Sequence, residues 1–120
     1  DPLDDAETLK MNEFGLITEV GGKPSHIGEI EGQYMGLIKL DPVGANLFAD
    51  MIEKGFSAKH GKQPNFDKAY LTDLLMALID SGAPVSAVCH SEPWVEVDTV
   101  EDLSSSETLR RLRVIECLKS

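Results

Sequence analysis

Residues 93–101 read PWVEVDTVE, an alternating run that leads directly into a helix-start signal. Side chains alternate along a β-strand, so the run predicts a strand with Trp94, Glu96 and Asp98 on one face and the intervening valines facing a core. The two carboxylates then lie about 6 to 7 Å apart, close enough for one to hold a divalent cation while the other meets a cationic or hydroxylated ligand. A solvated edge-strand face followed by a helix cap explains the same pattern, and both interpretations stay open.

The helix-start signal is a capping box, formed by Thr99 with Asp102 three residues later. It predicts a helix that continues toward the end of the chain. The triple serine Ser104–Ser106 weakens its first turns, because serine competes for the backbone hydrogen bonds of a helix. Its inner side is expected to carry Leu109, Leu112, Ile115 and Cys117.

Two further helices are predicted before this run. Asp41 followed by Pro42 is an N-cap with proline at the first helical position, and apolar residues recur at helical spacing until Gly55. The second helix is expected over residues 68–81, where a leucine-rich stripe ends at Gly82.

Other segments have strand or loop character. Residues 6–20 predict an antiparallel hairpin with a turn at residues 12–15, and a third strand at residues 33–40 would extend it to a meander. The segment VSAVC, residues 85–89, predicts a short strand. Residues 57–66 are polar and contain glycine and proline, which predicts a surface loop.

Length and composition indicate a globular protein. A chain of 120 residues is the size of one domain, residues 1–120, and can bury roughly two-thirds of its unfolded surface. Its net charge of −10 makes nucleic acid and anionic membranes unfavourable partners. The longest apolar run, Leu74 to Ile79, is far shorter than the ~20 residues of a spanning helix. With two cysteines that lack CxxC spacing and no signal peptide, a cytoplasmic location is expected.

Several polar residues are candidates for binding. Tyr70 and Asp73 open the helix at residues 68–81, where capping is favoured over contact with a substrate's ammonium or sugar hydroxyls. Glu29 and Glu31 alternate, and both face either one pocket or water. The histidines are scattered through loops, which favours surface positions: His26, His60 and His90.

Four segments, in this order and spacing, resemble the second half of a nucleotidyltransferase. The family includes sugar-phosphate nucleotidylyltransferases and bacterial phosphocholine cytidylyltransferases. The segments are GEIEGQYMGLIKL, the helix after Asp41-Pro42, YLTDLLMALIDSG and WVEVDTVEDL. The resemblance implies an α/β fold: the C-terminal half of a nucleotidyltransferase-type, Rossmann-like mixed sheet with flanking helices. In that family W-x-E-I-D-T-x-x-D-L closes the catalytic sheet, and its aspartate helps to hold a catalytic Mg²⁺.

The resemblance also implies roles for individual residues. Asp98 takes the catalytic, Mg²⁺-binding role, Glu96 lies beside the acceptor, and the strand around Gly32 to Gly36 borders the substrate pocket. The remaining candidate substrate-binding residues are Tyr70, Asp73 and Trp94. The family's glycine-rich nucleotide loop, its proline-lysine pair and its second metal-binding aspartate do not occur in this sequence. Because the sequence also begins with an aspartate, we expect a C-terminal, acceptor-binding portion of a longer enzyme, inactive alone.

The implied reaction joins a nucleotidyl group from CTP or another nucleoside triphosphate to a phosphorylated or phosphonate acceptor, with release of pyrophosphate. Phosphocholine, 2-aminoethylphosphonate and a sugar 1-phosphate are the candidate acceptors. A non-catalytic regulatory or assembly module that keeps the fold is the alternative, and an acidic α/β domain that binds partner proteins is a third. A sheet edge left uncovered by the missing half predicts a homo-oligomer.

Overall fold

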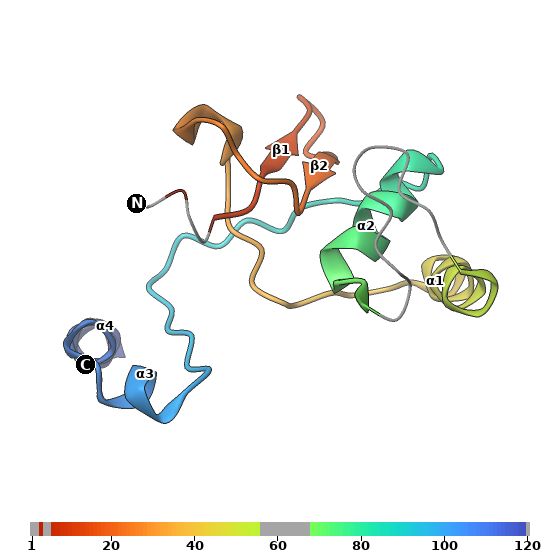
Figure 1. Ribbon diagram of the computed structural model, residues 1–120. Coiled ribbons are helices and arrows are strands. Elements are labelled where there is room, and N and C mark those ends of the chain that lie inside the picture. Colours follow the sequence, from red (N-terminus) through yellow and green to blue (C-terminus); the bar gives the residue numbers. More distant parts are fainter. Residues whose placement is uncertain (1–2, 4–5, 56–67, 120) are drawn as a thin grey trace. The chain divides into compact units, whose positions relative to one another are not determined.

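The structure, a computed structural model, describes residues 3, 6–55 and 68–119 (Figure 1). These residues form a mixed α/β structure with one two-stranded antiparallel sheet and four α-helices. They divide into two compact units, Asp1–Val88 and Cys89–Ser120, called the first and the second unit here. The loop predicted at 57–66 lies outside the described residues, and the single domain over 1–120 stays a prediction.

A hairpin forms where the sequence predicts it. β1 (Leu9–Met11) pairs antiparallel with β2 (Ile17–Val20), and Lys10 stands opposite Glu19. The turn is held by Asn12, whose side-chain oxygen accepts hydrogen bonds from the backbone N–H groups of residues 14 and 16, each at 3.0 Å. Asparagine favours turns because its side chain can bond to the following backbone in this way.

The outer side of β1 is covered by the segment that follows the hairpin. Leu9 forms an isolated parallel bridge with Ile30, and the N–H of Glu31 donates to the carbonyl of Leu9 at 2.9 Å. The strand predicted at residues 33–40 is wrong, because that segment has no strand and Leu37 is 85% exposed. Glycines within the segment weaken a strand, and among the described residues no strand pairs with it.

The outer side of β2 is also covered. Leu16 bridges Ser86 antiparallel, and the N–H of Ile17 donates to the carbonyl of Val85 at 2.8 Å. The strand predicted at residues 85–89 is therefore reduced to a single bridge. Since both sides of the hairpin have partners, the uncovered edge on which the homo-oligomer prediction depended is not found at this hairpin.

Two helices complete the first unit. α1 (Pro42–Lys54) is capped by Asp41, whose carboxylate accepts from the N–H of Gly44 at 2.6 Å, and it ends at Gly55 as predicted. α2 (Leu71–Asp80) begins at Leu71 rather than at residue 68 and ends before Gly82. Figure 1 shows α2 beside the hairpin and α1 beside α2.

The apolar core of the first unit lies between the hairpin and α2. Its buried cluster contains Leu9, Val20, Leu75 and Leu78. Side chains from α1 and from the segment before it pack against this cluster and are partly buried; they include Tyr34, Phe48 and Met51. The predicted leucine-rich stripe of α2 therefore forms the core-facing side of that helix, except at its first residue, Leu71, which is 43% exposed.

The second unit contains two helices where one was predicted. α3 (Val100–Ser104) and α4 (Ser106–Lys119) are separated at Ser105, whose backbone is extended (φ −64°, ψ 145°). The break lies inside the triple serine, as expected from the weak helical preference of serine. The predicted inner side of this helix is wrong, because Leu109 and Leu112 are 46% and 39% exposed.

The strand predicted over residues 93–98 is also wrong. This segment has no regular structure, and Val97 is 46% exposed rather than buried in a core. Alternation can stabilise a strand only where a neighbouring strand supplies hydrogen bonds, and the described part of the second unit contains no strand.

None of the helices in the described ranges has the length and apolar character needed to cross a membrane.

Candidate functional site

The capping box predicted at the start of α3 is present. The Asp102 carboxylate oxygen Oδ2 accepts hydrogen bonds from the N–H and the hydroxyl of Thr99, both at 2.8 Å. In return, the N–H of Asp102 donates to the Thr99 hydroxyl oxygen at 3.1 Å. The Thr99 hydroxyl and then its N–H stabilise the charged carboxylate, which lowers the pKa of Asp102 below its ordinary value.

The same carboxylate also holds Asp98. The backbone N–H of Asp98 donates to Asp102 Oδ2 at 3.2 Å, while the Asp98 residue itself is exposed. The backbone at this position is thus tied to the first turn of α3. Asp98 is therefore tied down at its backbone while the residue stays exposed to solvent.

Glu96 and Trp94 lie in the irregular segment before α3. Glu96 is exposed and Trp94 is half-buried. Because no strand forms here, the alternation that was expected to set Glu96 and Asp98 on one face is absent. Their proposed proximity has no support from regular structure.

At the start of α2, the favoured capping interpretation is confirmed for Asp73. Its carboxylate accepts from the backbone N–H of Tyr70 at 2.8 Å. The charge also lies at the positive end of the helix dipole, where a carboxylate is stabilised. The Tyr70 side chain is exposed at the same helix end, with 76% of its surface accessible.

Gly32 lies in the segment that covers β1. A β-carbon added at this position would lie 3.6 Å from Cδ2 of Leu9, which is an ordinary van der Waals contact. Gly32 therefore packs beside the core rather than in a strand of its own. Its place at the border of a substrate pocket stays a prediction.

The six predicted site residues are divided between the two units. The first unit contains Gly32, Tyr70 and Asp73, and the second contains Trp94, Glu96 and Asp98. Within the ranges that the structure describes, the hydrogen bond between Tyr70 and Asp73 is the one that directly joins two of the six.

A charged network in the first unit was not predicted. The ammonium Nζ of Lys10 lies 2.9 Å from Oε2 of Glu19 and 3.3 Å from Oε1 of Glu29. The other oxygen of Glu29 accepts from the N–H and the hydroxyl of Ser25, at 2.7 and 2.9 Å. These bonds from Ser25, followed by Lys10, lower the pKa of Glu29 to about 2.

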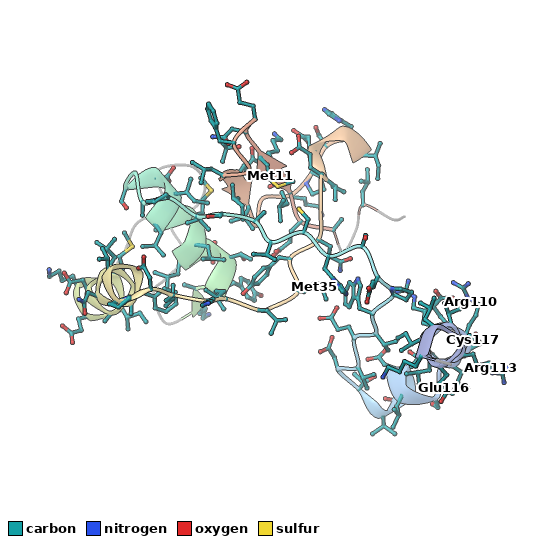
Figure 2. All side chains as sticks on the ribbon, turned by 180° about the vertical axis from the view of Figure 1, so that it is seen from behind. Met11, Met35, Arg110, Arg113, Glu116 and Cys117 are labelled. Carbon is teal, nitrogen blue, oxygen red and sulfur yellow. The ribbon has the colours of Figure 1, made fainter. Side chains whose placement is uncertain are left out.

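Glu29 and Glu31 have structural roles in the first unit. From the sequence alone, it was open whether they face one pocket or water. Glu29 ends the short helix η1 (Ile27–Glu29) and binds back to β1. The carboxylate of Glu31 accepts from the N–H of Met11, which is labelled in Figure 2, at 2.8 Å. Lys10 and Glu19 face each other across the hairpin, a cross-strand pair that the predicted register could have revealed. No sequence spacing links Glu29 to that pair.

The carboxylates of the described residues meet the needs of a magnesium ion only in part. The described ranges hold no group of three or more histidine, cysteine, aspartate or glutamate residues placed to bind a metal. In phosphate-transfer sites, Mg²⁺ commonly takes one or two protein carboxylates together with substrate phosphates and water. The exposed carboxylate of Asp98 suits one such ligand, and the described residues do not form a complete site.

The chain is similar to a known enzyme. Over 107 residues the chain is 39% identical to CTP:phosphoglutamine cytidylyltransferase from Campylobacter jejuni. The match takes in 85% of this chain and 40% of that protein, so the chain spans less than half the length of the curated relative. No family model matches the chain, and no solved structure matches it.

This similarity supports the predicted relation to nucleotidyltransferases. The name of the relative describes an enzyme that uses CTP. The C-terminal position within a longer enzyme and the Rossmann-like sheet stay predictions.

Proposed function

We propose that this chain is the acceptor- and metal-binding portion of an enzyme that transfers a cytidylyl group from CTP to a phosphorylated acceptor. The observation that carries this proposal is the 39% identity over 107 residues to a protein named CTP:phosphoglutamine cytidylyltransferase. The matched region takes in nearly the whole chain and therefore includes most of the segments on which the family resemblance rests.

In the proposed reaction, a phosphate oxygen of the acceptor attacks the α-phosphorus of CTP. The bond between the α-phosphorus and its bridging oxygen breaks, and pyrophosphate leaves with the electron pair. Little covalent chemistry is required of the protein in this type of transfer, so its task is to position the groups and balance their charge.

Phosphoglutamine is the acceptor that the relative's name suggests for the first test. Phosphocholine, 2-aminoethylphosphonate and sugar 1-phosphates follow from the family resemblance. The chain has exposed groups suited to an amine or an amide: the ring of Tyr70 and the carboxylate of Glu96. Gly32 in the first unit and Trp94 in the second stay separate candidates for contact with the acceptor, and Asp73 caps the end of α2 at Tyr70.

Asp98 is proposed to supply one carboxylate to Mg²⁺, with the substrate phosphates completing the site. When bound, the ion supplies positive charge that offsets the repulsion between two phosphate groups. Asp98 contributes an exposed carboxylate whose backbone is held by Asp102.

Pyrophosphate release by the longest polypeptide that carries this sequence tests the proposal. CTP and UTP are each combined with the four acceptor types, and Asp98→Ala is compared with Asp50→Ala. Asp50 is also exposed, and it lies on α1, where it pairs with Lys54 at 3.1 Å. We expect release that depends on CTP, that is lost in Asp98→Ala and that is retained in Asp50→Ala.

The other results are equally informative. No turnover with any pair, in a folded protein, would favour the non-catalytic module. Turnover by the 120-residue chain alone would show that this chain is more than an acceptor-binding portion. A homo-oligomer and a cytoplasmic location stay predictions, and light scattering at high protein concentration tests the first.

A further inference from the structure

The carboxylate of Asp102 binds more than a capping box requires. In an ordinary capping box, the third helical residue accepts from the N–H of the cap residue, here Thr99. Asp102 Oδ2 accepts from that N–H and from the Thr99 hydroxyl, and it also accepts from the N–H of Asp98 at 3.2 Å. The cap therefore extends one residue upstream, to Asp98, the residue proposed to bind Mg²⁺.

Asp98 lacks the support that a strand would give it. The residues from 93 to 98 have no regular structure, so no ladder of backbone hydrogen bonds fixes their direction. Within the described residues, the bond to Asp102 is the hydrogen bond shown for Asp98. A hydrogen-bonded N–H restricts the backbone dihedral angles on either side of it. These angles set the direction in which the Asp98 side chain points away from the backbone.

We propose that Asp102, together with Thr99, is a positioning residue that sets the direction of the Asp98 carboxylate through the extended cap of α3. This inference depends on the role of Asp98 given under Proposed function. Neither residue contacts the reacting atoms in this account. Their effect passes through the backbone of residue 98.

Groups that orient a metal ligand commonly change metal affinity or activity by about 10- to 100-fold when they are removed. We therefore expect Asp102→Ala to lower the rate of pyrophosphate release about 10- to 100-fold in the full polypeptide. It should also raise the Mg²⁺ concentration that gives half of the maximal rate. Asp102→Asn keeps one oxygen that can accept from these N–H groups, so it should recover most of the loss.

Asp41→Ala is the matched control. Asp41 caps α1 through the N–H of Gly44, and it has no place in the proposed site. Both changes remove an aspartate that caps a helix, so a general loss of stability from a missing cap would appear in both variants. We expect the rate and the Mg²⁺ dependence of Asp41→Ala to match those of the unchanged protein.

Two measurements do not depend on turnover. Amide hydrogen exchange should become faster at residues 98 and 99 in Asp102→Ala, while Asp41→Ala leaves these two amides unchanged. Binding of Mn²⁺ in the presence of CTP, followed by electron paramagnetic resonance, should weaken in Asp102→Ala and recover in Asp102→Asn.

The results separate the two proposals. If Asp98→Ala keeps full activity, the role of Asp98 is wrong and the positioning inference falls with it. If Asp98→Ala is inactive while Asp102→Ala behaves like Asp41→Ala, the proposed function stands and the positioning inference is wrong. If Asp102→Ala does not fold, a comparison of Thr99→Val with Thr99→Ser is made in its place. Only the valine removes the hydroxyl that donates to Asp102, so equal rates and Mn²⁺ affinities in the two variants would overturn the inference.

Discussion

Replacing Gly21 with alanine should destabilise the first unit strongly, because the substitution causes both backbone strain and a steric clash. Gly21 follows β2 and has a φ of +81°, a left-handed conformation that costs a residue with a side chain about 1 to 2 kcal/mol. The new β-carbon would also lie 2.7 Å from Cβ and 2.8 Å from Oγ1 of Thr72. Contacts this short force the neighbour to move.

Neither partner can move easily. The N–H of Gly21 donates to the carbonyl of Thr8 at 3.1 Å, and Thr72 is only 6% exposed in the first turn of α2. Overpacking at such a site typically costs about 1 to 3 kcal/mol. Together the two penalties give a loss of about 2 to 5 kcal/mol in the free energy of unfolding. That is a large part of the 5 to 15 kcal/mol typical of a folded domain, as an order of magnitude.

Gly15→Ala separates the two penalties. Gly15 has a similar φ of +75°, but an added β-carbon would meet no atom within 4 Å. Urea unfolding followed by circular dichroism should show a loss of about 1 to 2 kcal/mol for Gly15→Ala and a clearly larger loss for Gly21→Ala. In a Thr72→Gly background the Gly21→Ala penalty should fall to the Gly15 value, because Thr72→Gly removes both contacting atoms. Equal losses for Gly15→Ala and Gly21→Ala in the unchanged background would refute the packing argument.

Three further measurements test other parts of the structure. Because the pKa of Glu29 is about 2 when folded and near 4.5 ordinarily, its stabilising contribution should be complete above pH 4.5 and lost as the pH falls toward 2. Urea unfolding between pH 5 and pH 2 should therefore show a steeper pH dependence for the unchanged protein than for Glu29→Gln. Asp41→Ala removes the cap of α1 and should lower the free energy of unfolding by about 1 kcal/mol in chemical denaturation. Leu78 is 4% exposed, so Leu78→Ala should lower the free energy of unfolding by about 2 to 5 kcal/mol. Val43 is 68% exposed, so Val43→Ala should change the free energy of unfolding by no more than about 0.5 kcal/mol in the same measurement.

The sequence predicted the features that depend on neighbouring residues. Asp41 with Pro42 and Gly55 gave both ends of α1, and Thr99 with Asp102 gave the start of α3. Each of these signals acts within a few residues, through a side chain that bonds to a nearby backbone group. Local chemistry of this kind can be read directly from the order of residues.

The strands predicted at residues 33–40 and 93–98 failed for the opposite reason. A strand exists only when another segment pairs with it, and alternation alone does not identify that segment. The site prediction has the same limit. It correctly expected Asp73 to cap α2, but it missed the third bond to Asp102 and the contact of Glu29 with Lys10. That contact joins residues whose closeness depends on how η1 folds back on β1.

The pairing on the outer side of β2 also has a consequence for the chain as it leaves the ribosome. Synthesis delivers residues in order, so β1 and β2 are complete well before Val85 is made. Until then, the N–H of Ile17 lacks the carbonyl that accepts from it in the finished structure. An open strand edge attracts other chains that carry unpaired backbone groups. In this interval the edge of β2 is therefore open to pairing with other chains, and the segment around Ser86 covers it once it is made.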